Sequence, residues 1–291
     1  MQNHEIQGSG ANRQRRAAAA LVLSALAFVY APVVASLVRQ WAGDENYSQG
    51  FIVVPFAVLA VWRARTALRA LPMRPHPAGL AIVVLGVLLL TVGQFGAELF
   101  LTRVSLLVVI AGTVWYLWGA AHVRCVAFAL VLVLLVIPLP SLILNRVSFP
   151  LQLLASRTAE AALSTAGVPV LREGNLLMLP HGALEVAQAC SGIRSLSSLI
   201  ALALMISGPG KRALFAVLAV PVAVIANAVR VAGTGFAAVW LGQWAAEGFL
   251  HTFSGWLMFV VALAALIGCA RTIEWISTRS PWWVAPRSLP S

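Results

Sequence analysis

Charged residues are scarce in this chain. Asp, Glu, Lys and Arg make up only 10% of its 291 residues, whereas soluble domains average about 25%. Acidic residues are the rarer sign, with 9 Asp and Glu against 20 Lys and Arg. With 60% hydrophobic residues, the chain has too few polar groups to cover a water-facing surface. We therefore expect a helical, polytopic membrane protein rather than a soluble domain.

The net charge of +11 does not indicate nucleic-acid binding. The basic residues fall in short clusters between apolar runs, which is the pattern of membrane-topology signals and not of a continuous basic patch. Cysteine is also rare, and Cys125, Cys190 and Cys269 have neither CxxC nor metal-ligand spacing. No disulfide scaffold, metal site or cofactor is expected.

Apolar runs predict about eight transmembrane helices, since about 20 apolar residues cross a bilayer. The arginine-ending tail 1–16 precedes a run too long for the hydrophobic part of a signal peptide. We predict one membrane domain over 17–276, followed by the tail 277–291. The candidate spans are Ala17–Leu37, Gly50–Trp62, Ala78–Gln94, Phe100–Trp118, Cys125–Leu144, Leu196–Ser207, Ala213–Val229 and Thr252–Ala270.

Charge sets the expected orientation. With both termini in the cytoplasm, most basic residues and only two acids, Glu5 and Glu274, lie inside, as the positive-inside rule requires. Tryptophans at predicted span ends fit an interfacial belt: Trp41, Trp62, Trp115, Trp118 and Trp275. In the segment before the sixth span, Phe149–Ala166 predicts an amphipathic interfacial helix, with apolar positions Leu151, Leu154, Ala155, Ala159, Ala162 and Leu163. Gly and Pro within Val168–Leu184 predict a short hairpin or lid.

Three reactive residues reach the same predicted membrane face. Cys190 precedes the sixth span, Arg230 ends the seventh and His251 opens the eighth. A cysteine beside a helix N-terminus and a cation has a lowered pKa, a histidine carries protons near neutral pH, and an arginine stabilises an oxyanion. Together they suit acyl transfer through a thioester, with the site spanning 184–256. Residues expected to support them or bind substrate are Glu185, Ser191, Gly192, Arg194, Asn227, Asp44 and Tyr47.

Each of these residues also has a structural interpretation. A lone membrane cysteine commonly packs as a small apolar residue, an arginine near a helix end snorkels to the interface, and a histidine at a helix start is commonly structural. The loop carrying Asp44 and Tyr47 is either solvated or faces the substrate. Ionisable residues inside membranes nevertheless favour function, and three on one face strengthen that interpretation.

Several blocks resemble the exosortase and archaeosortase family of membrane cysteine transpeptidases. The strongest is LEVAQACSGIRSL, followed in order by NAVRV and HTFSGW. Weaker similarity lies in Asp44–Arg65, Ile137–Ala159 and Gly174–Pro180. Gln49 stands where the family commonly has histidine in its Tyr-x-His-Gly block, which leaves the role of that loop open.

The resemblance implies an enzyme that cleaves a C-terminal sorting signal of exported proteins. Such signals combine a short motif (Pro-Glu-Pro in one bacterial class), a hydrophobic helix and a basic cluster. The family's cysteine, arginine and histidine correspond to Cys190, Arg230 and His251. The resemblance also implies a bacterial inner-membrane location with the site facing outward, transfer to an unidentified surface acceptor, and neither cofactor nor nucleic acid.

Two alternatives stay open at this point. One is a hydrolytic intramembrane protease, which would use the same nucleophile with water as the acceptor. The other is a non-enzymatic membrane protein, such as a transporter or a polysaccharide-export subunit. A transporter should carry polar residues at mid-membrane depth, whereas the charges here sit at the predicted span ends.

Overall fold

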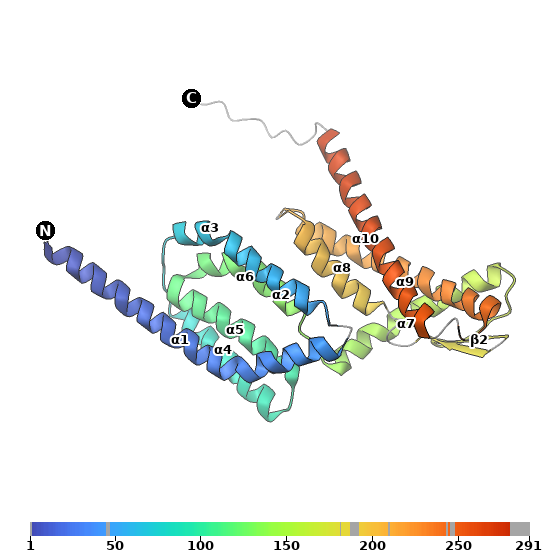
Figure 1. Ribbon diagram of the computed structural model, residues 1–291, viewed down its shortest axis with the longest axis horizontal. Coiled ribbons are helices and arrows are strands. Elements are labelled where there is room, and N and C mark those ends of the chain that lie inside the picture. Colours follow the sequence, from blue (N-terminus) through green and yellow to red (C-terminus); the bar gives the residue numbers. More distant parts are fainter. Residues whose placement is uncertain are drawn as a thin grey trace. The chain divides into compact units, whose positions relative to one another are not determined.

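The computed structural model describes residues 2–44, 47–180, 182–186, 192–208, 210–242, 244 and 248–279. These residues form two compact units, Met1–Pro140 and Ser141–Ser291. Most of each unit is helical, as expected for a polytopic membrane protein (Figure 1). The second unit contains the segment around the predicted site.

The first unit consists of helices and carries four of the predicted spans together with most of a fifth. Its helices are α1 (Gln2–Gly43), α2 (Gly50–Arg63), α3 (Arg65–Ala70), α4 (Ala78–Phe95), α5 (Leu99–Trp118) and α6 (Ala120–Leu135). α4 and α5 form a tight hairpin in which glycines let the backbones approach. A Cβ built on Gly93 would lie 2.8 Å from the Thr102 nitrogen, and one on Gly112 2.7 Å from the Val83 nitrogen. Small residues serve this purpose at membrane helix interfaces.

Polar contacts tie α1 to the rest of the first unit. The Trp41 indole donates to the Val136 carbonyl oxygen at 2.9 Å, and the indole side chain is 6% exposed. The prediction that Trp41 belongs to an interfacial belt is therefore wrong, because its N–H has a buried partner inside the protein. Arg103 of α5 is 3% exposed and donates to the Ser36 hydroxyl at 3.2 Å.

Several predicted span boundaries differ from the helices that the structure describes. The seventh span was expected to end at Val229, but its helix runs from Arg212 to Leu241, so Arg230 lies within the helix and not at its end. The apolar run Cys125–Leu144 was expected to be a single helix, but α6 ends at Leu135 and α7 (Ser141–Thr165) begins after a break. Pro138 and Pro140 explain the break, because proline has no N–H to continue the helical hydrogen-bond ladder and disfavours helix in the residue before it.

The second unit combines helices with a small sheet. After α7 come β1 (Leu171–Glu173), β2 (Leu176–Leu179) and β3 (Gly182–Glu185), an antiparallel meander in the order β1-β2-β3. The expected hairpin is thus confirmed, with one strand more. α8 (Ile193–Ile206), α9 (Arg212–Leu241) and α10 (Gly248–Arg279) follow.

The face of α7 that packs within the second unit carries both apolar and polar residues. Ala155, Ala159 and Leu163 are buried, and so are Ser148, Gln152 and Ser156. Leu154, another of the predicted apolar positions, is 44% exposed. Ser156 has a specific partner in the β1–β2 turn. The location of this helix in the membrane interface stays a prediction.

α9 joins two separate hydrophobic cores. Its first half packs with α8 and α10 around Leu199, Ala203, Phe215, Ala219, Ala223, Ala262 and Leu266. Its second half packs with α7 and the sheet around Ala155, Ala159, Leu177, Val186 and Val231. Asn227 and Arg230 lie where the first core gives way to the second, so the fold places both at a boundary between a three-helix bundle and a sheet-capped layer.

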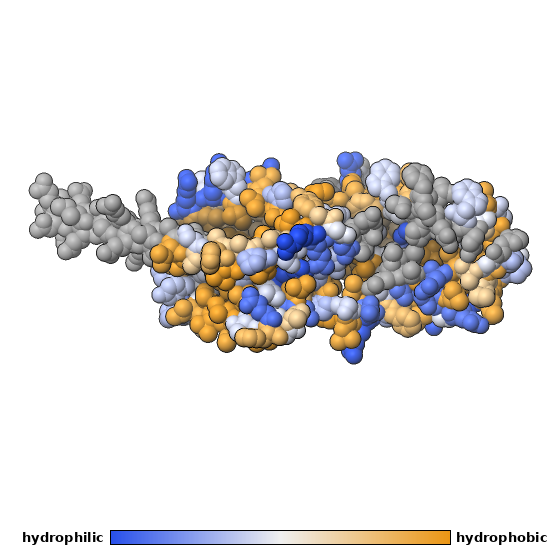
Figure 2. All heavy atoms as spheres, turned by 60° about the horizontal axis from the view of Figure 1, so that its bottom comes forward, coloured by the Kyte–Doolittle hydropathy of each residue, from blue (hydrophilic) through white to orange (hydrophobic). Residues whose placement is uncertain are grey.

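Many large apolar side chains are exposed in both units, among them Phe28, Phe95, Val217 and Ile225. The face shown in Figure 2 has wide hydrophobic areas between hydrophilic ones. Among the described residues, five helices are long and apolar enough to cross a membrane, and three shorter apolar helices overlap with other predicted spans. A multi-pass membrane protein follows from these helices, whereas the count of eight stays a prediction.

Candidate active site

Asn227 and Arg230 lie three residues apart on α9, on about the same helix face. Asn227 is 7% exposed and Arg230 is half-buried. The Thr234 hydroxyl donates to the Arg230 carbonyl oxygen at 3.0 Å, within the same helix. On this face of α9, Asn227 is thus buried within the second unit, and Arg230 is partly covered.

Gly192 brings the start of α8 against Asn227. It is the residue preceding α8 and has a left-handed backbone, with φ of +77°. A Cβ at this position would lie 2.8 Å from Cγ of Asn227, closer than real atoms approach. Both the left-handed turn and the close contact require glycine. The chain thus leaves the sheet, turns at Gly192 and enters α8 while touching the polar face of α9.

Arg230 reaches in the other direction, to α10. Its Nε donates to the Ser254 hydroxyl in a long hydrogen bond of 3.4 Å. A Cβ on Gly255 would lie 3.2 Å from both Cζ and the second terminal nitrogen of Arg230. The guanidinium is therefore packed on the backbone of α10 at a position without a side chain.

Three segments that are distant in sequence meet at this point: the start of α8, the middle of α9 and the first turns of α10. Cys190 lies outside the described residues, two positions before Gly192. His251 belongs by its backbone to α10, one turn before Ser254 and Gly255. The described neighbours of these two residues thus converge on Arg230 and Asn227.

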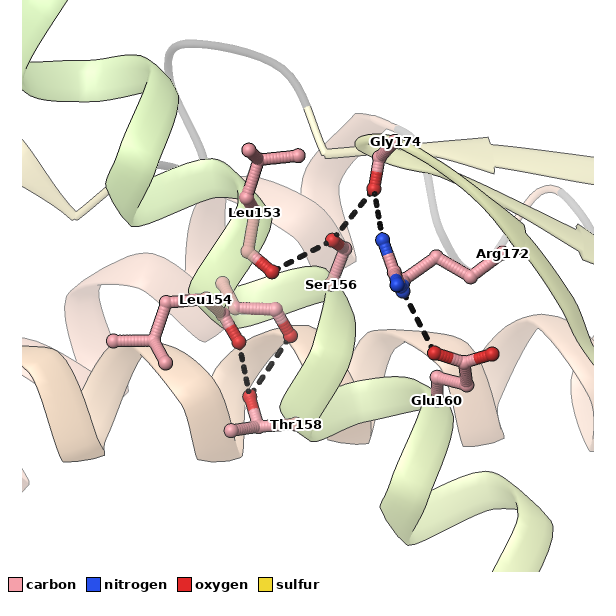
Figure 3. Close-up of polar contacts among 8 residues, drawn as sticks. Leu153, Leu154, Ser156, Thr158, Glu160, Arg172 and Gly174 are labelled. Atoms are coloured by element: carbon pink, nitrogen blue, oxygen red, sulfur yellow. Dashed lines mark hydrogen bonds and ion pairs between the residues drawn. The ribbon is translucent and has the colours of Figure 1, made fainter.

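The segment before Cys190 is anchored to α7 (Figure 3). The Ser156 hydroxyl, fully buried, lies 2.9 Å from the carbonyl oxygen of Gly174 in the β1–β2 turn. Arg172 bonds the same carbonyl at 3.1 Å and pairs with Glu160 of α7 at 2.7 Å. One turn carbonyl therefore accepts from two side chains, which fixes the hairpin to the helix.

A second pair of bonds continues this anchor toward the cysteine segment. The Val186 N–H donates to the Asn175 carbonyl oxygen at 2.9 Å, and the Asn175 amide donates back to the Val186 carbonyl oxygen at 3.2 Å. Val186 is buried and is the last described residue before 187–191. The chain thus enters the cysteine segment from a fixed point.

The other predicted site residues have different positions. Glu185 ends β3 and is exposed, Arg194 lies in the first turn of α8, and Ser191 lies outside the described residues. Asp44 and Tyr47 belong to the first unit, where the Tyr47 hydroxyl accepts from the Leu139 N–H at 3.4 Å. Tyr47 is half-buried in that unit.

Sequence reasoning missed Ser254, Gly255 and Asn175. Ser254 and Gly255 follow His251 by three and four residues, the spacing of one helix face, so helical periodicity offered a signal. Asn175 follows Gly174, and such a pair is typical of turns. The pair therefore indicates a turn, but it does not indicate that Asn175 bonds to Val186.

The place where α8, α9 and α10 meet around Asn227 and Arg230 is called the junction below. Its side chains can stabilise negative charge that develops during a reaction. A guanidinium held by packing and a hydrogen bond is a preorganised donor, which is the arrangement that stabilises an oxyanion at low reorganisation cost. The buried Asn227 amide adds a neutral donor and acceptor beside the entrance of α8.

Comparison with known families agrees with this geometry. A family model described as transmembrane exosortase matches residues 41–268, most of the chain, including every segment that meets at the junction. Neither the curated proteins nor the solved structures contained a match to the chain.

Proposed function

The chain belongs to the transmembrane exosortase family, and on that premise we propose that it is a membrane cysteine transpeptidase. Its substrates are exported proteins that carry a C-terminal sorting signal made of a short motif, a hydrophobic helix and a basic cluster. The observation that carries the proposal is the packing of the Arg230 guanidinium on α10 beside Ser254 and Gly255.

The depth at which Arg230 would lie in the membrane also supports the proposed function. At about 1.5 Å per residue, Arg230 lies roughly 27 Å along α9 from Arg212, close to the thickness of a hydrocarbon core of about 30 Å. The remainder of α9 packs with α7 and the sheet. A substrate whose own helix spans the bilayer would present the peptide bond next to that helix at this depth. The charge distribution of the chain favours the outer face of the membrane for the site, and the family implies that this is the periplasmic face of a bacterial inner membrane.

The proposed reaction begins at Cys190. Its thiol gives its proton to His251, and the thiolate attacks the carbonyl carbon of the scissile peptide bond. Arg230 stabilises the oxyanion of the tetrahedral intermediate. The C–N bond then breaks, and His251 returns the proton to the leaving amine. A thioester remains on Cys190, and an amine of the acceptor or a water molecule attacks it and releases the thiol.

We assign the proton to His251 because a guanidinium does not deprotonate in proteins, whereas imidazole does so near neutral pH. Arg230 then acts as a fixed positive charge throughout the cycle. Glu185, Ser191, Gly192, Arg194 and Asn227 are proposed as supporting residues around the cysteine, and Asp44 and Tyr47 as a substrate-facing loop.

Substrate processing in cells tests the proposal. The protein is co-expressed with a reporter that carries a Pro-Glu-Pro-type C-terminal signal, and the reporter size is followed by immunoblot. We expect processing in the wild type and none in Cys190→Ala. Cys125→Ala and Cys269→Ala serve as matched controls and should process normally, since Cys125 is half-buried in α6 and Cys269 is exposed on α10.

The product identifies the acceptor. Mass spectrometry of the processed reporter gives a free carboxylate if water resolves the thioester and an amide adduct if an amine does. A size shift that survives in Cys190→Ala would rule out the thioester mechanism. Processing that is lost in every cysteine variant alike would point to instability and not to chemistry.

A further inference from the structure

The Arg230 side chain is held by two residues of α10, Ser254 and Gly255, which lie within the predicted site segment 184–256 but were given no role there. Nε bonds the Ser254 hydroxyl at 3.4 Å, and Cζ lies against the Gly255 backbone. The two contacts constrain the guanidinium in different ways. The hydrogen bond sets the rotation of its plane, and the glycine sets how closely it approaches α10.

An arginine needs such support to act as an oxyanion donor. Its long side chain samples many rotamers, and fixing them costs conformational entropy. If that cost is met when the protein folds, the donor is already in place when charge develops in the transition state. A half-buried arginine packed against a neighbouring helix fits this requirement.

Helix register connects the same positions with the proposed acid–base residue. Residues 251, 254 and 255 fall at i, i+3 and i+4 of α10, which places them on one helix face. A contact that fixes Arg230 on this face therefore also fixes the distance between Arg230 and the backbone of residue 251. One helix would set the spacing of two of the three reactive groups.

We propose that Ser254 and Gly255 are positioning residues that form a seat for Arg230, resting on the function proposed above. Ser254 orients the guanidinium through Nε, and Gly255 leaves room for it against α10. The seat acts on the rate of the chemical step by fixing the oxyanion donor.

The size of residue 255 gives a graded test. An alanine Cβ would lie 3.2 Å from Cζ, so the guanidinium must move by a few tenths of an ångström, and the bulkier Gly255→Val must displace it further. Gly268 lies on the same helix with no atom within 4 Å of an added Cβ, so Gly268→Ala and Gly268→Val are matched controls for helix propensity. Ser254→Ala removes the hydrogen bond, and Ser254→Thr retains the hydroxyl.

The experiment has a kinetic part and a thermal part. In the kinetic part, the full-length protein in nanodiscs processes a signal-bearing reporter. Gly255→Val should lower kcat by about 10- to 100-fold with little change in KM, as expected for a donor displaced by about 1 Å. Gly255→Ala should cause a smaller loss, Ser254→Ala should also lower kcat, Ser254→Thr should restore it, and both Gly268 variants should match the wild type.

The thermal part does not depend on activity. Gly255→Val should lower Tm in the presence of Arg230 but much less in an Arg230→Ala background, where the guanidinium that it clashes with is gone. An equal Tm loss in both backgrounds, or an unchanged kcat in Gly255→Val and Ser254→Ala, would contradict the proposal that Ser254 and Gly255 position Arg230. Processing that persists in Cys190→Ala would instead overturn the proposed function, and the Tm comparison would still decide whether the seat exists.

Discussion

Gly192 and Asn227 are in direct contact, although one precedes α8 and the other lies within α9. The contact is so close that a Cβ at 192 would lie 2.8 Å from Cγ of Asn227. Because Gly192 follows Cys190 by two residues, this contact fixes the point at which the cysteine segment joins the helices. The start of α8 is thus held against α9 at a position that has no side chain.

Substitution at Gly192 should therefore destabilise the protein by more than the strain of a left-handed backbone alone. Gly167 has the same φ of +77° but no atom within 4 Å of an added Cβ. Both Gly192→Ala and Gly167→Ala should lower the free energy of unfolding by about 1–2 kcal/mol, because alanine is strained in the left-handed conformation. Gly192→Ala should lose a further 1–3 kcal/mol or so from overpacking, and it should abolish processing. Thermal unfolding in detergent and the reporter assay measure the two effects.

Asn227→Gly combined with Gly192→Ala supplies the control for this prediction. The new methyl group would meet both Cγ of Asn227 at 2.8 Å and its Cβ at 2.9 Å, and glycine removes both atoms. Gly192→Ala should therefore lower Tm less in the Asn227→Gly background than in the wild type. Equal Tm losses at positions 192 and 167 would contradict the steric account.

Arg230→Ala should reduce catalysis without unfolding the protein. Loss of one oxyanion donor costs roughly 2.7–4 kcal/mol of barrier, about 100- to 1,000-fold in kcat. Arg230→Lys should recover only part of the rate, because lysine keeps the charge but lacks the planar fork and an Nε donor toward Ser254. The measurement is kcat for reporter processing, with Arg157→Ala, an exposed arginine on α7, as the control. A lysine variant as active as the wild type would show that charge alone suffices.

The sequence predicted the helices of this fold better than the contacts between them. The predicted spans Ala78–Gln94 and Phe100–Trp118 differ by one residue at an end from α4 and α5, because both are predominantly apolar runs that end beside a glycine, Gly96 or Gly119. Trp41 was misassigned because its partner, Val136, is distant in the chain. Contacts such as those of Gly192 with Asn227 and of Arg230 with Gly255 depend on helix packing, which hydrophobic periodicity does not encode.

The contacts that anchor the hairpin to α7 should differ in how much each contributes to stability. Ser156 is fully buried, so Ser156→Ala should destabilise the protein by about 1 kcal/mol. The Arg172–Glu160 pair is partly exposed, with side chains 22% and 34% accessible, so Glu160→Gln should cost less and its effect should shrink at high salt. Urea or thermal unfolding at low and high ionic strength tests the order. A larger and salt-independent loss for Glu160→Gln would reverse the ranking.

Tyr47 should make the protein sensitive to alkaline pH. Burial raises the pKa of this phenol above its ordinary value near 10, and nearby Asp44 raises it further, although the Leu139 N–H and Arg103 oppose the shift. A group whose pKa is raised in the folded state adds stability that is present below the unfolded pKa and is lost as the pH rises through the folded pKa. Unfolding should therefore become easier above about pH 10, and Tyr47→Phe should lose less stability over the same range. Tm measured between pH 8 and 11 for both proteins tests this, and identical alkaline slopes would show that Tyr47 ionises as readily in the folded protein as in the unfolded chain.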